Sequence, residues 1–363
     1  MPHPILLLPD ELLSEIFTQY LPPYPQCPPL VGPSSPTYLL GISRAWRAIA
    51  LHTPTLWRAI KLEVYTDQGS EIALQWLERS GSSLLSLQLS TVIFDPLSDM
   101  PIPPADTEWE KPLVQALVAN RWRWQYVNWD LGPSMVSRTA TSPLEAPQLV
   151  ELTLGTVRQS DEFRGILFLH NCTRLRSVSL WNVGYASESL PWAQLTTLAL
   201  LNTEPPTHCV SILLLARSLV RLRVYTRRST SDASTQNNAL PDRIELPLLE
   251  TLVLDNNDEP PHNWLSPLVL PSLRHLAISC ELLGSRWKHS EFAHLDAFMA
   301  RCRPPLEHLQ VTWGLGYFDL PGPGLAHVLQ ASFSAATIRL CPALSLDDKS
   351  WTTDRYWNEA AAE

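Results

Sequence analysis

A six-residue leucine frame, L-x-x-[LIV]-x-[LIV], recurs through most of this 363-residue chain. In-frame copies begin at Leu84, Leu149, Leu175, Leu195, Leu219, Leu249, Leu273 and Leu306, with one out-of-frame copy at Leu265. From Leu149 on, successive starts lie 26, 20, 24, 30, 24 and 33 residues apart. A recurrence of this length is typical of a solenoid, in which each repeat is one supersecondary unit stacked on the next.

The frame predicts a short strand in each repeat, with its first, fourth and sixth residues pointing into a shared core. Weaker copies fit at Trp124, Val127 and Trp129 and at Ala335, Ile338 and Leu340. Segments between the frames, such as 211–218 and 291–301, have helical composition. The expected fold class is therefore α/β: a curved parallel sheet with outer helices. An ordinary α/β fold with leucine-rich strands is the alternative.

The N-terminal part has a different pattern, that of three short helices. Residues 8–21 place Leu12, Leu13, Ile16, Phe17 and Tyr20 at helical spacing, and Pro9 suits the first turn. Residues 22–37 hold seven prolines and read as a loop. Helical pattern resumes over 38–51, and a short turn follows in which Thr53 can cap and Pro54 can begin the turn. Because so small a helical module buries little apolar surface, we expect it to dock on a partner.

Two stretches of this part, LPDELLSEIF and SRAWRAIALHTPTLWRAI, resemble the F-box over residues 8 to 60. The resemblance implies a three-helix hook that binds the Skp-family adaptor of an SCF-type, cullin-based ubiquitin ligase. It also implies which side chains face the adaptor, with Trp57 helping to close the hook: Leu8, Pro9, Leu12, Leu13, Ile16, Phe17, Leu39, Ile42, Trp46, Leu56 and Trp57. Alternatively, these helices only cap the larger domain.

The rest of the chain resembles the irregular leucine-rich repeats that follow the F-box in many fungal proteins. The run IALQWLERSGSSLLSLQL, residues 72–89, is similar to the junction between the two parts. The expected organisation is an F-box at 1–62 with a proline-rich insertion at 22–37, a repeat solenoid at 63–344 and an acidic tail or cap at 345–363. Aromatic residues of that tail are expected to cover the last coil.

Strand alternation predicts that the third, fifth and seventh residues of each frame line one face of the sheet. Aromatic and arginine side chains there are the types that dominate protein interfaces. The predicted binding surface for a protein substrate comprises Trp181, Arg221, Arg223, Tyr225, Asp255, His275 and His308. The alternative is that Arg221 and Arg223 only pair with acidic neighbours on a solvated face.

Enzyme chemistry has little support in the sequence. No phosphate-binding glycine loop, H-E-x-x-H or G-x-S-x-G occurs, so we expect no catalytic residue and no cofactor. His289, His294, Cys302 and His308 have poor zinc spacing, and no metal is expected. A net charge of -9 disfavours nucleic acid, and the RWRWQYVNW run at 121–129 reads as a half-buried strand.

The cysteines and the hydropathy of the sequence indicate where in the cell the protein is expected. The six cysteines form no C-x-x-C, which favours reduced thiols in a cytoplasmic or nuclear protein. The apolar run at residues 5–8 is too short for a signal peptide, and no stretch of 18 apolar residues indicates a membrane span. The expected function is substrate recognition for a ubiquitin ligase, and the alternative is an interaction scaffold without that role.

Overall fold

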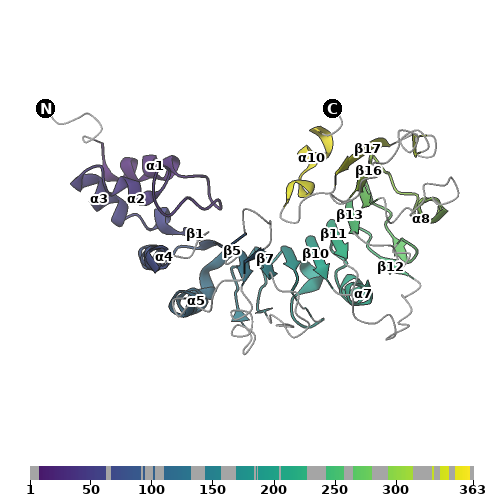
Figure 1. The fold of residues 1–363 in the computed structure, drawn as a ribbon, viewed down its shortest axis with the longest axis horizontal. Helices are drawn as coiled ribbons and strands as arrows, with labels where there is room; N and C mark the ends of the chain where they lie inside the picture. Colours follow the sequence, from purple (N-terminus) through teal and green to yellow (C-terminus); the bar gives the residue numbers. More distant parts are fainter. Residues whose placement is uncertain are drawn as a thin grey trace. The chain divides into compact units, whose positions relative to one another are not determined.

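A computed structural model gives the fold and describes residues 8–62, 67–90, 93–94, 101–102, 110–131, 144–156, 169–183, 185, 187–203, 206–226, 243–256, 265–279, 293–313, 329–330, 336–342 and 348–359. The chain folds into two compact units. Figure 1 draws the helices and strands of both. Unit 1 comprises residues 1–175 and 182–190, and unit 2 comprises residues 176–181 and 191–363. The boundary near residue 175 therefore falls inside the stretch predicted as one solenoid.

Unit 1 begins with a helical module. Its elements are α1 (Asp10–Tyr20), α2 (Pro36–Leu39), α3 (Arg44–Leu51) and the 3-10 turn η2 (Pro54–Trp57). The predicted single helix over 38–51 is wrong, because the chain turns between α2 and α3. Ser43 starts the second helix afresh, since its hydroxyl accepts a hydrogen bond from the Trp46 backbone N–H at 3.1 Å.

Thr53 does not cap the turn that Pro54 begins. Its hydroxyl instead donates to the Ile49 carbonyl at 2.8 Å, at the end of α3. The backbone continues directly from η2 into strand β1 (Ala59–Leu62), which pairs with β2 (Leu85–Ser90). Residues predicted to end the helical module therefore form the first strand of the sheet.

Four parallel strands of unit 1 follow the order β1-β2-β5-β7, with β5 at Trp124–Leu131 and β7 at Glu151–Thr156. The predicted strand in the RWRWQYVNW run is confirmed from Trp124 on. Between the strands lie α4 (Asp67–Arg79), α5 (Glu110–Ala119), the 3-10 turn η3 (Arg121–Arg123) and the short strands β3 (Ile93–Phe94), β4 (Pro101–Ile102), β6 (Leu144–Glu145) and β8 (Leu169–His170).

Seven parallel strands of unit 2 follow the order β9-β10-β11-β13-β15-β16-β17. Their bounds are β9 (Ser177–Trp181), β10 (Thr197–Thr203), β11 (Arg221–Thr226), β13 (Thr251–Asn256), β15 (His275–Ser279), β16 (His308–Trp313) and β17 (Thr337–Pro342). The remaining elements are η4 (Trp192–Gln194), α7 (Pro206–Leu215), β12 (Ile244–Glu245), β14 (Leu268–Val269), α8 (Ala293–Cys302), η6 (Ser350–Thr352) and α10 (Asp354–Glu359).

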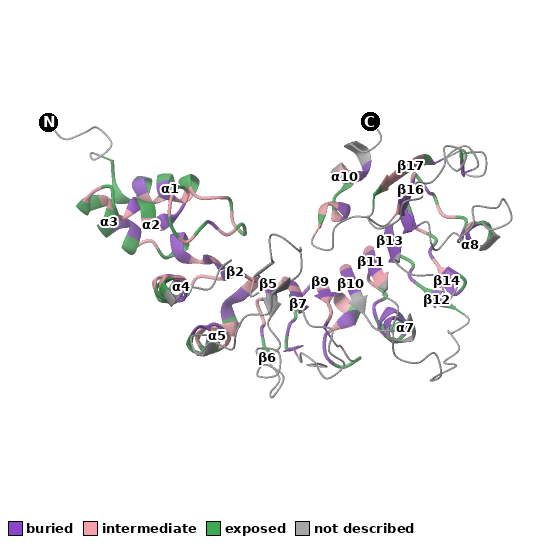
Figure 2. Cartoon of the chain, viewed as in Figure 1, coloured by how far each residue is buried: buried purple, intermediate pink, exposed green. Residues whose placement is uncertain are grey.

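The leucine frame forms the core that it predicts. In every copy from Leu149 to Leu306 the first, fourth and sixth residues are buried, as the purple strands of Figure 2 show. The copy at Leu84 differs, because Leu84 is half-buried while Leu87 and Leu89 are buried. The fold is thus mixed α/β, with eleven parallel strands in the described residues and helices between them.

Helices predicted between the frames are found, with shifted bounds. Helix α8 matches the expectation for 291–301 closely, whereas α7 begins and ends earlier than 211–218. The short strands β12 and β14 pair with each other and were not predicted. Among the described residues no helix is both long and apolar enough to span a membrane.

Candidate functional site

The helical module of unit 1 exposes a set of apolar side chains. Of twelve large hydrophobic residues exposed in the described part of the chain, eight lie between residues 8 and 51. They are Leu8, Leu12, Ile16, Tyr20, Val31, Tyr38, Ile42 and Leu51. Figure 2 draws the exposed residues of the module, apolar and polar alike, in green. An accumulation of exposed apolar surface in one small module marks an interaction site.

The residues predicted to face an adaptor divide into two groups. Leu8, Pro9, Leu12, Ile16 and Ile42 are exposed, and Trp46 is half-buried with its ring 4.7 Å from that of Phe17. In contrast, Leu13, Phe17, Leu39, Leu56 and Trp57 are at most 2% exposed. An outward orientation for Leu13, Phe17, Leu39 and Leu56 is wrong, because these side chains, together with Trp57, form the module's own core. They can support a docking surface but do not belong to it.

The proline-rich loop is attached to the sheet of unit 1. Ser86 on β2 donates a hydrogen bond to the Pro25 carbonyl at 2.6 Å, and Tyr24 donates to the Gln125 side chain at 2.8 Å. The Tyr24 ring also contacts the ring of Tyr126 edge-on and lies under the Arg58 guanidinium. Burial raises the pKa of Tyr24 above its ordinary value. The loop is therefore anchored, which its composition did not reveal.

The loop also holds a thiol against β2. Cys27 Sγ lies 3.5 Å from the Ser86 hydroxyl, and burial raises the pKa of this thiol. A raised pKa keeps the thiol protonated near neutral pH, which is the opposite of what a nucleophilic cysteine requires. Cys27 thus serves packing.

In unit 2 the third, fifth and seventh residues of the frames form three ladders across the strands, and we call this surface the ladder face. Paired strands are aligned so that Arg221 lies beside Thr197 and Thr251, and His275 lies beside Thr251 and His308. The fifth-position ladder includes the small side chains Ala199, Val253 and Ala277. Arg223 lies between Ala199 and Val253 in this ladder, and Val253 is next to Ala277. Small side chains at these positions leave room for large side chains from elsewhere.

That room is filled by residues 348–359 of the same chain, which we call the C-terminal segment. Trp351 and Trp357 are 2% and 3% exposed and pack in one cluster with Ala199, Leu201, Val253 and Ala277. Tyr225, Trp181 and Tyr356 pack against this cluster. The expected cover of the last coil is therefore wrong in position, since the aromatic residues lie over the middle strands.

This cover decides the accessibility of the predicted substrate residues. Arg223, Asp255 and His275 are buried, at 1%, 3% and 7% exposure, so the expectation that they are accessible is wrong in this arrangement. The others, Trp181, Arg221, Tyr225 and His308, remain half-buried. The sheet brings all seven residues onto one face, but the C-terminal segment already occupies much of it.

Two arginines of the ladder face pair with acidic residues. Arg223 Nε lies 3.1 Å from Asp255 Oδ2 on the neighbouring strand, and Arg223 also donates to the Asp348 carbonyl at 3.2 Å. Arg221 lies 3.6 Å from Asp354 of the C-terminal segment. The alternative interpretation, that both arginines pair with acidic neighbours on a solvated face, holds for the pairing but not for the solvation, because Arg223 and Asp255 are buried. For Arg223 the pair is fully buried and is therefore structural.

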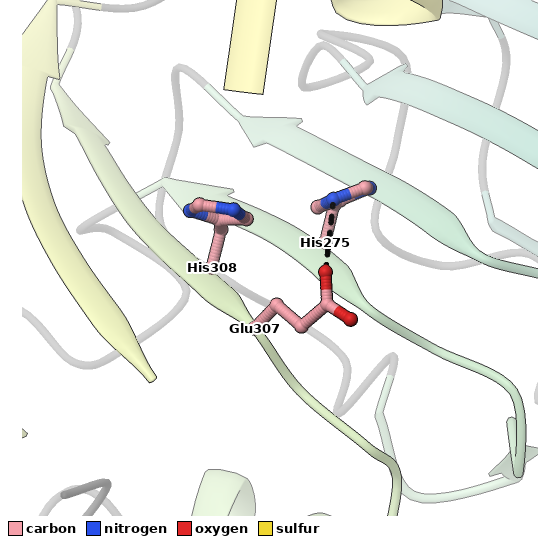
Figure 3. A group of neighbouring side chains, drawn as sticks. All are labelled: His275, Glu307 and His308. Atoms are coloured by element: carbon pink, nitrogen blue, oxygen red, sulfur yellow. Dashed lines mark ion pairs between the residues drawn. The ribbon is translucent and has the colours of Figure 1, made fainter. Parts of the chain in front are cut away.

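His275, Glu307 and His308 offer three potential metal-ligand atoms within 4.8 Å of one another (Figure 3). His275 is kept neutral, because burial and the neighbouring His308 lower its pKa to about 4. However, Arg274 donates two hydrogen bonds to Glu307 Oε1, at 2.8 and 2.6 Å. The guanidinium neutralises the one carboxylate of the trio, so the group lacks the net negative charge that would attract a divalent cation.

Sequence reasoning missed several contact residues of these surfaces. Gln310 exchanges hydrogen bonds with the Tyr356 hydroxyl, at 2.9 and 3.2 Å, and Tyr24 and Gln125 join the loop to the sheet. One signal was present: small residues at the fifth position of several frames, together with an aromatic segment elsewhere in the chain. A scan against family models finds no match, and a search of curated proteins finds no significant similarity.

Proposed function

We propose that this chain is the substrate-recognition subunit of an SCF-type cullin ubiquitin ligase. Residues 8–60 act as an F-box that binds a Skp-family adaptor and, through it, a cullin. The leucine-rich repeats hold a protein target in the cytoplasm or nucleus. In this role the chain supplies no catalytic group, and ubiquitin transfer depends on proximity. The observation that carries the proposal is the exposed apolar set on the helical module.

Position along the helix explains why this set suits an adaptor. Leu12 and Ile16 are four residues apart on α1, so their side chains share one face, and they are 52% and 42% exposed. Leu13 and Phe17 lie about 100° further around the helix, on the adjacent face, and are buried in the core of the module. The helix therefore has two apolar faces, one buried and one exposed. An isolated helical module needs only the buried face, whereas a module that docks on a partner needs both.

Features of the remaining chain support the repeat assignment. Parallel strands aligned at equivalent frame positions, with buried first, fourth and sixth residues, are what stacked repeats require. Such an array presents a broad face to a partner, and on this chain the face carries aromatic and arginine side chains.

Co-expression with a Skp-family adaptor tests the proposal. We expect the wild-type chain to co-purify with the adaptor. With the double variant Leu12→Asp and Ile16→Asp we expect the amount of recovered adaptor to fall at least tenfold. Both positions are well exposed, so the substitutions should leave the fold intact. Leu248→Asp is the matched control, because Leu248 is 54% exposed but lies in unit 2. Failure of the wild-type chain to co-purify, or retention by the double variant, would overturn the assignment.

A scaffold without a ligase role is the second candidate, and one observation favours it. Trp57 of the module packs edge-on against Trp76 of α4 at 5.5 Å, and Arg79 of α4 lies over the Trp57 ring. These contacts join the module to the first repeat, as a solenoid cap would be joined. Under this reading the Leu12 and Ile16 substitutions change neither partner recovery nor stability.

A further inference from the structure

The C-terminal segment lies on the ladder face of unit 2 as a bound peptide would. It contributes one 3-10 turn and the short helix α10, and no strand of it pairs with the sheet within the described residues. The repeat core is built by the first, fourth and sixth frame residues, which lie on the other face of the strands. The sheet therefore has a core on that face, separate from the cluster that the segment forms with the ladder face.

Contacts between the segment and the ladder face combine two aromatic anchors with polar contacts around them. Trp351 and Trp357 fill the space over the small fifth-position residues, and the Trp357 ring stacks on His275 with centroids 5.0 Å apart. Trp357 Nε1 donates to the Trp351 carbonyl at 3.1 Å, so the two anchors are linked within the segment. Paired aromatic anchors in a fitted site are the usual centre of a protein interface.

Charge and hydrogen bonding set the orientation of the segment. Asp354, between the two anchors, lies 3.6 Å from Arg221, whose side chain is 29% exposed. Tyr356 exchanges hydrogen bonds with Gln310 of β16. An acidic residue thus faces a basic one, with aromatic residues on either side of it in the sequence.

The fit is incomplete at several polar atoms. Trp181 Nε1, Ser279 Oγ and Ser350 Oγ are buried without a hydrogen-bond partner within the described part of the chain. Two of these atoms belong to the ladder face and one to the segment. Buried polar atoms left unpaired weaken a contact, so a ligand that supplied acceptors to Trp181 and Ser279 would bind better than the segment does.

From these observations we propose that the C-terminal segment is an internal ligand of the ladder face, and that targets displace it with an acidic peptide carrying two aromatic residues in the same spacing. The spacing is that of Trp351, Asp354 and Trp357. This inference deepens the proposed function, because it assumes that the ladder face receives the target. Under this proposal the segment competes with the target, so a target must have enough affinity for the ladder face to displace the segment.

Peptide binding to the full chain tests the proposal. The probe is a fluorescein-labelled peptide of residues 348–359, DKSWTTDRYWNE, and the proteins are the wild-type chain and the full-length variant Trp351→Ala with Trp357→Ala. The tethered segment of the wild type competes at high effective concentration, so we expect the variant to bind the probe at least tenfold more tightly. A probe with both tryptophans replaced by alanine serves as the control and should not bind.

Equal binding of the probe by a folded variant and by the wild type would overturn the inference. Amide hydrogen exchange on the wild-type chain provides a second test, whose result does not depend on whether a variant folds. We expect amides of 350–359 to exchange at least a hundredfold faster than those of β11, β13 and β15, because the segment detaches while the sheet stays folded. Exchange of the segment only together with these strands would show that it is part of the core and would also refute the proposal.

The two proposals fail separately. Adaptor recovery depends on Leu12 and Ile16 in unit 1, whereas probe binding depends on Trp351 and Trp357 in unit 2. If the adaptor is not recovered but the variant binds the probe, the ladder face is a peptide-binding surface and the ligase role is wrong. If the adaptor is recovered but probe binding is unchanged, the ligase role stands and the internal ligand is refuted.

Discussion

His275 shows how one residue of the ladder face responds to its surroundings. Its ring lies between Trp357 and His308, with Thr251 Oγ1 3.3 Å from Nδ1 and Glu307 Oε2 4.0 Å from Nε2. Burial, with a further contribution from His308, lowers its pKa from 6.5 to about 4, although Glu307 and Asp354 act in the opposite direction. Desolvation therefore outweighs the attraction of the nearby carboxylates.

The lowered pKa of His275 predicts that the folded chain becomes less stable as the pH is lowered. Between about pH 6.5 and about pH 4 the unfolded chain binds a proton at this residue and the folded chain does not, so protons favour unfolding. Replacing His275 by Phe keeps a stacking ring and removes the titration. We expect the wild type to lose roughly 2 kcal/mol more than His275→Phe between about pH 7 and about pH 4.5. Urea unfolding at several pH values measures this, and parallel curves for the two proteins would contradict it.

At the scale of elements, a buried arginine of η3, directly before β5, joins this part of the chain to the end of α4. Arg123 is 1% exposed and donates to the Leu77 carbonyl, the Ser80 hydroxyl and the Ser83 carbonyl at the end of α4, at 3.0, 2.8 and 3.2 Å. The partial negative charge at a helix C-terminus favours a cation there. Desolvation lowers the pKa of Arg123 from its ordinary high value.

The planar guanidinium reaches several acceptors at once, which a lysine ammonium cannot do. We therefore expect Arg123→Lys to lower the free energy of unfolding by roughly 2 kcal/mol and to reduce amide protection at the end of α4. Arg174→Lys is the control, because Arg174 is exposed and donates only to Gln148 in the described contacts, so its effect should stay within about 0.5 kcal/mol. Urea unfolding and hydrogen exchange measure both effects. Equal effects of the two substitutions would refute the role of Arg123 in joining these elements.

Elements differ in how far the sequence predicts them. Strand positions follow from the leucine frame, because a buried side chain at the first, fourth and sixth residues is a local requirement of each repeat. The break between α2 and α3 was missed, since Leu39, Leu40 and Ile42 fit helical spacing and the capping role of Ser43 becomes clear only with the turn before it. Burial of Arg123 could not be predicted, because its partners lie about 40 residues away in sequence.

At the scale of the whole molecule, the frame predicts the sheet but not what covers it. Which residues share the ladder face follows from strand alternation alone, and the prediction that Trp181, Arg223 and Tyr225 lie together is met. The position of the C-terminal segment depends on contacts between Trp351 or Trp357 and strands far apart in sequence. No local pattern encodes such contacts, so the sequence suggested a terminal cap instead.

The division into two units predicts that damage to one spreads little to the other. Asp255→Asn leaves the Arg223 charge buried without its carboxylate partner, and removing one member of a buried pair costs about 3 to 5 kcal/mol. The contacts of this pair with Asp348 and Thr312 lie within unit 2, and repeat arrays transmit stability mainly between neighbours. We therefore expect hydrogen exchange to show lost protection in β10, β11 and β13 and unchanged protection in β1, β2 and β5.

The double variant Arg223→Met with Asp255→Leu should recover most of the loss, because it removes both charges together. Uniform loss of protection in both units would instead show that the chain unfolds as one cooperative body.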